Sequence, residues 1–213
     1  MRRAGAAREG PLIGFTLLSQ TAVGALWSLA AAEALSGPDA PPFLDARSLF
    51  VLFVVAGIGT LLSFFHLGKP LRAPNALSNL RESWLSREIL ADLVVLGTSA
   101  ALWGIAAFGN NEGTLRTVLI STAALAEFFL LFTMSRLYMI RTVPVWRGAQ
   151  TPVSFFLSAI FLGPLLAAIL APADGEVLST VRWAFVAIAL AASGFSFVAI
   201  ALVTPSVGLL ART

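Results

Sequence analysis

Long apolar runs separated by short polar segments dominate this sequence. Each of six runs is long enough to cross the ~30 Å hydrocarbon core of a bilayer, which takes roughly 20 residues of α-helix. The helices that we predict cover residues 11–34, 48–66, 88–108, 115–139, 152–171 and 181–203. The pattern therefore predicts an all-α, polytopic membrane bundle of six transmembrane helices, in which residues 1–213 form a single transmembrane domain.

Prolines and capping residues agree with these boundaries. Pro70 and Pro144 follow the predicted second and fourth helices, and Thr151 with Pro152 is typical of an N-cap followed by a first-turn proline. Pro164 lies inside the predicted fifth helix, where its missing N–H is expected to produce a kink.

The composition excludes a water-soluble globular domain and most metal chemistry. Hydrophobic residues make up 58% of the chain and charged residues only 12%. The absence of cysteine excludes iron–sulfur ligation and cysteine-based zinc sites, and a single histidine, His66, excludes a haem held between two histidines of this chain. We therefore predict no haem, iron–sulfur cluster or metal here, so that any electron transfer depends on centres in another chain.

The basic residues indicate how the bundle is oriented. On one side of the predicted membrane lie only Arg47, Arg116 and Arg182. The other side carries Arg2, Arg3, Arg8, Lys69, Arg72, Arg81, Arg87, Arg136, Arg141, Arg147 and Arg212. Because short cytoplasmic loops are enriched in Lys and Arg, this asymmetry predicts that both termini are cytoplasmic.

The segment between the predicted second and third helices gathers the polar side chains that chemistry would need. His66 ends one helix and Glu88 begins the next, so both are expected at similar depth, and Asp92 follows Glu88 on the same helical face, ~6 Å deeper. The spacing of Leu77, Leu80 and Trp84 predicts a short amphipathic helix in the membrane interface. A quinone headgroup needs hydrogen-bond partners for two carbonyls and a route for two protons, which one histidine, one carboxylate and nearby arginines at that depth would supply. A proton could pass between the two carboxyl groups.

Each of these residues also has a structural explanation. His66 could cap the helix that it ends, and Glu88 could interact with the positive end of a helix dipole or pair with Arg87 or Lys69. The arginines of this side could simply set the topology and contact lipid phosphates.

Glu127 is unusual because it falls at the centre of the predicted fourth helix. A carboxyl group at that depth must be neutral, paired or lined by water. It is either a member of a proton relay or a protonated group that hydrogen-bonds a neighbouring helix, with Gln20, Thr21 and Ser99 as candidate partners.

Two segments of the chain are distinctive: FFHLGKPLRAPNALSNLRESWLSREIL, residues 64–90, and SRLYMIRTVPVWRGAQTPVSFFLSAIFLG, residues 135–163. Both resemble the membrane anchor subunit of dimethyl sulfoxide reductase and its relatives. The usual anchor of that family is longer, with eight spans. Both segments lie in the part that is present here, in the same order and in corresponding topological positions.

The resemblance implies two peripheral partners: a molybdopterin catalytic subunit and a ferredoxin-like iron–sulfur subunit. It also implies a quinone, menaquinone or ubiquinone, as the bound substrate of the anchor, with His66 and Glu88 taking part in binding. The predicted quinone site comprises His66, Arg72, Trp84, Arg87 and Glu88, and the predicted proton relay comprises Asp92 and Glu127. The predicted docking face for the iron–sulfur subunit comprises Lys69, Arg81, Arg136, Arg141 and Arg147.

Together these observations predict a multi-pass protein of a bacterial or archaeal cytoplasmic membrane that is not catalytic alone. Its predicted function is to anchor a molybdenum oxidoreductase complex and to link that complex to the quinone pool. The expected partners are the two subunits and membrane lipids, with no nucleic acid. Two alternatives remain: an anchor without a quinone site, and a proton-coupled transporter that uses Asp92 and Glu127.

Overall fold

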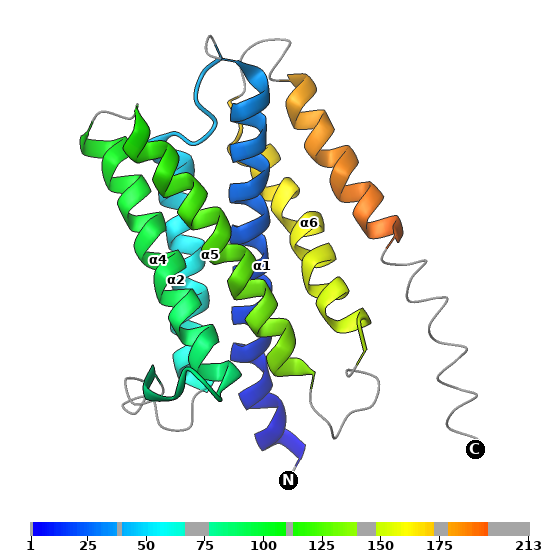
Figure 1. Ribbon diagram of the computed structural model, residues 1–213. Helices are drawn as coiled ribbons and strands as arrows, with labels where there is room; N and C mark the ends of the chain where they lie inside the picture. Colours follow the sequence, from blue (N-terminus) through cyan, green and yellow to red (C-terminus); the bar gives the residue numbers. More distant parts are fainter. Residues whose placement is uncertain are drawn as a thin grey trace.

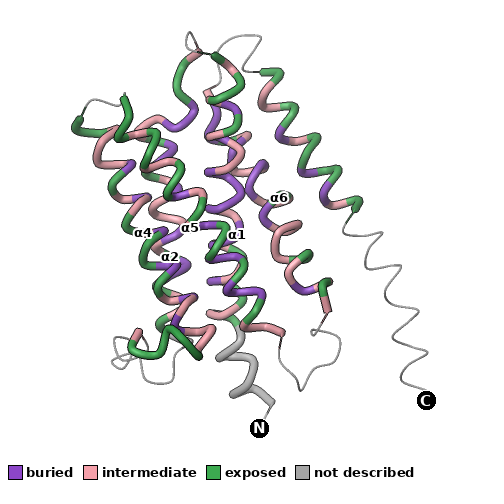
Figure 2. Tube along the Cα trace, viewed as in Figure 1, coloured by how far each residue is buried: buried purple, intermediate pink, exposed green. Residues whose placement is uncertain are grey.

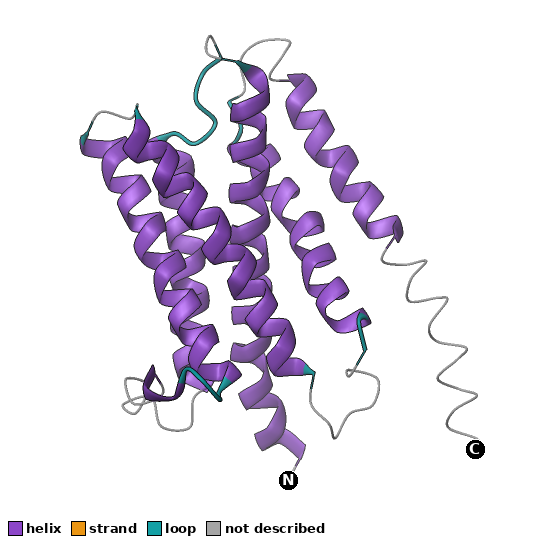
Figure 3. Ribbon diagram, in the orientation of Figure 1, coloured by secondary structure: helices purple, strands orange, loops and turns teal. Residues whose placement is uncertain are grey.

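The computed structural model describes residues 2–37, 40–66, 77–109, 113–139, 148–172 and 179–195, with the backbone alone for residues 2–9, 65 and 66. The elements are α1 (Arg2–Ser36), α2 (Ala46–His66), the 3₁₀ turn η2 (Leu77–Asn79), α4 (Trp84–Phe108), α5 (Thr114–Tyr138), α6 (Gln150–Leu170) and a further helix, Ser179–Phe195. Within these ranges every regular element is helical (Figures 1 and 3).

Five of the helices are long and apolar enough to cross a membrane. They are Gly10–Ser36, Ala46–Phe64, Trp84–Phe108, Thr114–Tyr138 and Gln150–Leu170. For the sixth predicted helix, residues 181–203, the structure describes Ser179–Phe195, which is shorter than these spans. Residues 196–203 lie outside the described part of the chain. The all-α membrane architecture is therefore confirmed, and the sixth span and the orientation of the termini stay predictions.

Two helices begin earlier than the apolar pattern predicted. Helix α1 begins at Arg2 and contains Pro11 in its interior, because the alanine-rich segment before Pro11 favours helix. Helix α4 begins at Trp84 because Ser83 caps it: the backbone of Ser83 is extended and its hydroxyl accepts a hydrogen bond from the Ser86 N–H at 3.2 Å. The prediction of an amphipathic interfacial helix is therefore wrong for residues 77–83. In this segment a single 3₁₀ turn, η2, is followed by Ser83, the N-cap of α4.

Helix α1 is the central element of the bundle. It packs against α2 and α6, while α4 packs against α5 and α2 (Figure 1). Buried residues gather on the facing sides of these helices, and exposed residues lie on their outer sides (Figure 2). Large apolar side chains such as Leu125 and Phe128 of α5 are exposed, as expected for surfaces in contact with lipid.

Helices α1 and α6 are in backbone contact at two glycines. A Cβ atom at Gly163 would overlap backbone atoms of Gly24 and Ala25, and a Cβ atom at Gly24 would overlap the Ala159 carbonyl. Such close approach requires glycine on both helices and maximises van der Waals contact, which drives helix association inside a membrane.

We call the end of the bundle where α4 begins the arginine end, because Arg81, Arg87 and Arg136 lie there. At the opposite end the connection between α1 and α2 is held in place by Glu33 and Arg116, which form an ion pair. The Glu33 carboxylate also accepts the N–H of Leu44 at 2.9 Å, and the Arg116 guanidinium donates to the Leu44 carbonyl at 3.4 Å. Phe43 and Leu44 are both fully buried, so this connection is part of the core.

Replacing Arg116 with Met should destabilise the protein. Glu33 would keep a partly buried charge without its cation, and we expect a loss of about 1–3 kcal/mol in the free energy of unfolding. Thermal unfolding of the purified protein, followed by circular dichroism, measures this loss. Arg47→Met is the matched control, because Arg47 is exposed at the same end; an equal loss in the two variants would show that the ion pair contributes nothing.

Candidate functional site

The buried acidic residues of α4 lie near the arginine end. Glu88 and Asp92 are 5% and 8% exposed, and both point into the bundle from one face of α4. Their carboxyl groups are close enough to interact electrostatically. The two acids therefore lie on the same face of α4, as predicted, and the structure adds that this face is buried.

Two of the structural explanations for Glu88, the helix dipole and an ion pair with Arg87, do not fit the described part of the chain; Lys69, the other candidate partner, lies outside it. Since α4 begins at Trp84, Glu88 lies in the second turn, where the helix dipole has less influence. Among the described residues it forms no ion pair, and the Arg87 guanidinium donates instead to the carbonyls of Leu80 and Arg81, at 2.8 and 2.6 Å. One Glu88 oxygen, Oε2, is buried without a hydrogen-bond partner in this part of the chain. An orphaned carboxyl oxygen is costly, which favours a role in binding a ligand or a proton.

Asp92 connects the site to α2. The hydroxyl of Thr60 is the hydrogen-bonding neighbour of its carboxyl group, and Thr60 is itself buried. Because α2 and α4 are antiparallel neighbours, this contact places the end of α2, residue 66, level with the first turn of α4. The backbone thus agrees with the expected common depth of His66 and Glu88. The side chain of His66 lies outside the described residues.

Tyr138, the last residue of α5, completes the site and was not singled out from the sequence. Its hydroxyl lies 3.2 Å from the Thr16 hydroxyl of α1, and it is close enough to Glu88 to interact electrostatically. Thr16 donates its only hydroxyl hydrogen to the Leu12 carbonyl at 2.9 Å. Thr16 can therefore only accept from Tyr138, so the phenol donates its hydrogen toward α1.

Trp84 and Arg87 of the predicted quinone site belong to a cation–π cluster with Arg136 of the predicted docking face. The Arg87 and Arg136 guanidinium carbons lie 4.3 and 5.1 Å from the Trp84 ring centroid. Phe132 meets the same ring edge-on, with 5.8 Å between centroids. The cluster joins the first turn of α4 to the last turns of α5 and holds two positive charges at the arginine end.

Glu127 is separate from the other acids. It is 2% exposed and its Oε2 has no hydrogen-bond partner among the described residues. Glu127 lies eleven residues before Tyr138, or ~16 Å along α5. Since Tyr138 is level with Glu88, Asp92 and Glu127 are separated by roughly 10 Å of depth. A relay between them therefore requires further groups; of the candidate partners of Glu127 predicted from the sequence, Gln20 and Ser99 are buried.

Arg81 is exposed beside this site, at the arginine end. The remaining predicted residues, Lys69, Arg72, Arg141 and Arg147, lie outside the described part of the chain. Within the described ranges, no group of three or more His, Asp or Glu side chains could hold a metal ion.

Comparison with known proteins gives consistent matches. The family description "DMSO reductase anchor subunit (DmsC)" matches residues 4–207. The chain is 34% identical over 181 residues to the anaerobic dimethyl sulfoxide reductase chain YnfH of Escherichia coli, covering 84% of this chain and 63% of that protein. It is 37% identical over 163 residues to the C subunit of the anaerobic dimethyl sulfoxide reductase of E. coli, covering 74% of this chain and 56% of that subunit.

The corresponding C subunit of Haemophilus influenzae is 33% identical over 156 residues, which cover 73% of this chain and 56% of that protein. The chain thus spans somewhat more than half the length of these relatives. No solved structure matches it.

Proposed function

Because the chain belongs to the DMSO reductase anchor subunit family, we propose that it anchors a molybdopterin and iron–sulfur oxidoreductase complex in the cytoplasmic membrane. In this proposal it passes electrons between the quinone pool and the iron–sulfur clusters of a partner subunit. The observation that carries the proposal is the buried pair Glu88 and Asp92 near the arginine end, with one Glu88 oxygen lacking a partner among the described residues.

The groups at this end match what a quinone requires. Reduction of a quinone takes up two electrons and two protons, and oxidation of the quinol releases both. In this proposal Glu88 exchanges a proton with the headgroup, and Asp92, one turn deeper, exchanges that proton with Glu88. The proposed role of the Tyr138 hydroxyl is to hydrogen-bond the quinol or a protonated Glu88. His66 at the end of α2 is the proposed partner of the second oxygen of the headgroup.

The positive charges at the same end suit a docking face. Arg81 and Arg136 are exposed there, and Trp84 with Arg87 holds Arg136 in place. We assign this surface to the iron–sulfur subunit, since a cluster docked here would lie on the same side of the membrane as Glu88. In the proposed orientation this side is cytoplasmic. Glu127 is the proposed inner member of the proton relay.

Affinity isolation of the tagged chain in mild detergent tests the proposal. We expect mass spectrometry to identify a molybdopterin subunit and an iron–sulfur subunit in stoichiometric amounts, with molybdenum, iron and quinone in the preparation. The chain recovered alone and without metal would contradict the anchor function and favour the transporter. Recovery of both partners without quinone, together with normal quinol turnover after His66→Ala and Glu88→Gln, would instead indicate an anchor without a quinone site.

Replacing Tyr138 with Phe tests the hydrogen bond assigned to its hydroxyl. Phe keeps the ring contact with Phe155, whose centroid lies 5.3 Å away, and removes only the oxygen. Loss of one neutral hydrogen bond should raise the KM for quinol by roughly threefold to tenfold. Steady-state kinetics with a soluble quinol analogue measure this KM, and the dye-coupled activity of the same preparation is the reference. Thr98→Val, which removes an exposed hydroxyl bonded within its own helix, is the control; similar KM values for the two variants would remove Tyr138 from the site.

A further inference from the structure

The guanidinium of Arg87 is bonded to the segment that precedes α4. Its Nε donates to the Leu80 carbonyl at 2.8 Å, and one terminal nitrogen donates to the Arg81 carbonyl at 2.6 Å. Both bonds lie at the exposed surface, whereas the neighbouring Glu88 is 5% exposed. Because successive residues of a helix point about 100° apart, Arg87 and Glu88 leave α4 on different faces. Two of the five N–H groups of the guanidinium are therefore used outside the buried site.

Ser83 and Arg87 stabilise the start of α4 together. The Ser83 hydroxyl accepts the Ser86 N–H at 3.2 Å, and the Ser83 carbonyl accepts the Arg87 N–H at 3.3 Å. The N–H of Ser83 donates in turn to the Asn79 carbonyl at 3.1 Å. The two carbonyls that the Arg87 side chain holds lie within the loop that this bond closes. The position of the cap thus depends on Arg87, and the cap determines where α4 begins.

Trp84 extends this arrangement to α5. The Arg87 guanidinium carbon lies 4.3 Å from the Trp84 ring centroid, and that of Arg136, near the end of α5, lies 5.1 Å from it. Glu88 follows Trp84 by one turn of α4, and α5 ends at Tyr138, which is close enough to Glu88 to interact electrostatically. The contacts of Trp84 therefore help to set the position of Glu88 relative to Tyr138.

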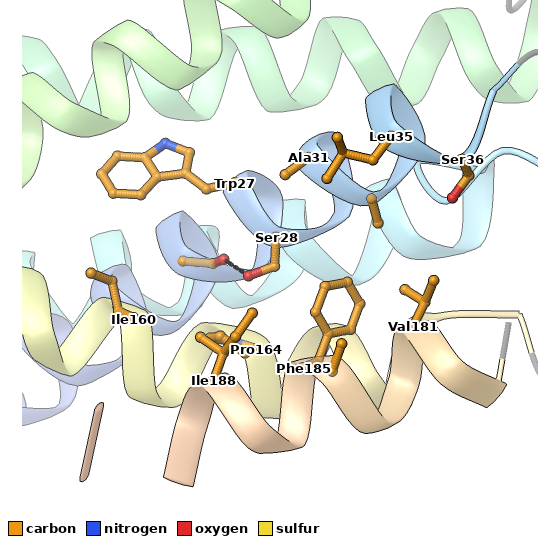
Figure 4. A pocket seen from close by; sticks show the side chains of 13 residues that line it. Trp27, Ser28, Ala31, Leu35, Ser36, Ile160, Pro164, Val181, Phe185 and Ile188 are labelled. Carbon is orange, nitrogen blue, oxygen red and sulfur yellow. Dashed lines mark hydrogen bonds between the residues drawn. The ribbon is translucent and has the colours of Figure 1, made fainter. Parts of the chain in front are cut away.

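A hydrogen bond within a single helix does not have this effect. Figure 4 shows an apolar pocket between α1, α6 and the helix Ser179–Phe195, in which the Ser28 hydroxyl donates to the Gly24 carbonyl of the same helix at 2.7 Å. This bond lies in the half of α1 away from the arginine end and holds no element against another. It provides a comparison for the bonds of Arg87, which join α4 to the segment before it.

We propose that Arg87 is a positioning residue for Glu88 and not a ligand of the quinone, an inference that rests on the proposed function of the Glu88 site. A planar guanidinium can donate to two carbonyls and stack on an indole at the same time, whereas a compact ammonium group cannot do both. These contacts keep the first two turns of α4 in place, so the Glu88 carboxyl keeps its distance from the headgroup. A displacement of ~1 Å at a reacting group can lower a rate by about 100-fold.

The test compares Arg87→Lys with Arg87→Gln in the assembled complex. Lys keeps the charge and Gln removes it, but neither replaces the planar fork of donors. Both variants should lower the quinone-coupled kcat by about tenfold to 100-fold, with the KM for quinol and the dye-coupled activity within about twofold of the unmodified complex. Backbone hydrogen exchange in a peptide covering residues 80–88, measured by mass spectrometry, should be roughly threefold to tenfold faster in both.

Two control variants should change neither kcat nor this exchange. Arg47→Lys makes the same replacement at an exposed arginine in the first turn of α2. Ser28→Ala removes the hydrogen bond within α1. Trp84→Phe is a second perturbation if the Arg87 variants fail to assemble. Phe keeps an aromatic ring but attracts cations more weakly than Trp does, so both effects should appear with smaller factors.

The two readouts separate a positioning residue from a ligand. A KM that rises in Arg87→Gln and is restored in Arg87→Lys, with unchanged hydrogen exchange, would show that Arg87 binds the quinone and would overturn the proposal. An unchanged kcat in both Arg87 variants, in a complex that Glu88→Gln inactivates, would overturn it as well. Normal quinone turnover in Glu88→Gln would instead contradict the proposed function, and the positioning role would fall with it even if the exchange became faster.

Discussion

Glu88→Gln should lower quinone-coupled turnover of the assembled complex by at least about 100-fold, because a positioned acid–base group contributes roughly 10²–10⁴-fold. Gln has nearly the same shape as Glu but cannot exchange a proton. Glu88 is buried with one oxygen lacking a partner among the described residues, so an amide at this position should leave the fold intact. Reduction of the partner clusters by quinol, measured in a stopped-flow instrument, should slow by this factor.

Dye-coupled activity of the same preparation is the internal reference for Glu88→Gln. Dyes reach the partner subunits directly, so this activity should stay within about twofold of the unmodified complex. Glu82→Gln, an exposed acid on the approach to α4, is the matched control and should change neither activity. Asp92→Asn should lower quinone-coupled turnover less than Glu88→Gln does, because in the proposed relay Asp92 exchanges its proton with Glu88 and not with the quinone. If Glu88→Gln lowered quinone-coupled and dye-coupled activity equally in an assembled complex, this result would contradict a quinone role for Glu88.

The sequence predicted the helices well because membrane spans follow from apolar length alone. It misplaced the start of α4, since the apolar run begins near Glu88 while the hydrogen bond from Ser86 to Ser83 determines where the helix begins. That difference of one turn changes the interpretation of Glu88, from a residue at a helix terminus to a buried acid in a second turn. Capping depends on the local geometry of polar residues, which hydropathy does not report.

The local part of the site was predictable and the non-local part was not. Glu88 and Asp92 are four residues apart, so helical periodicity alone places them together. Tyr138 and Thr16 are separated by 122 positions, and the contact of Trp84 with Arg136 also joins distant segments. Only the packing of α1, α4 and α5 brings these side chains together. One signal was present in the sequence: Tyr138 is the single tyrosine of the chain, and it lies at the end of a predicted membrane-spanning helix.

Gly163→Leu should destabilise the protein more than Arg116→Met, because it acts at the contact between two backbones. A Cβ at position 163 would overlap Gly24 and Ala25, whose backbone atoms cannot rotate away as a side chain could. The two helices must separate, and the van der Waals contacts around Ala159 and Ala167, both fully buried, would weaken. We expect a loss of about 3 kcal/mol, corresponding to a fall in Tm of roughly 6–12 °C.

Gly97→Leu separates this contact from the general effect of replacing a helical glycine. Gly97 lies in the interior of α4, is exposed, and has open space where a Cβ would be added. Its replacement should leave the Tm unchanged or raise it slightly, since helix propensity improves by up to about 1 kcal/mol. Circular dichroism melts in the same detergent compare the two variants. Similar Tm values would show that α1 and α6 tolerate separation, and the stability of the bundle would then depend on the α1–α2 and α4–α5 contacts instead.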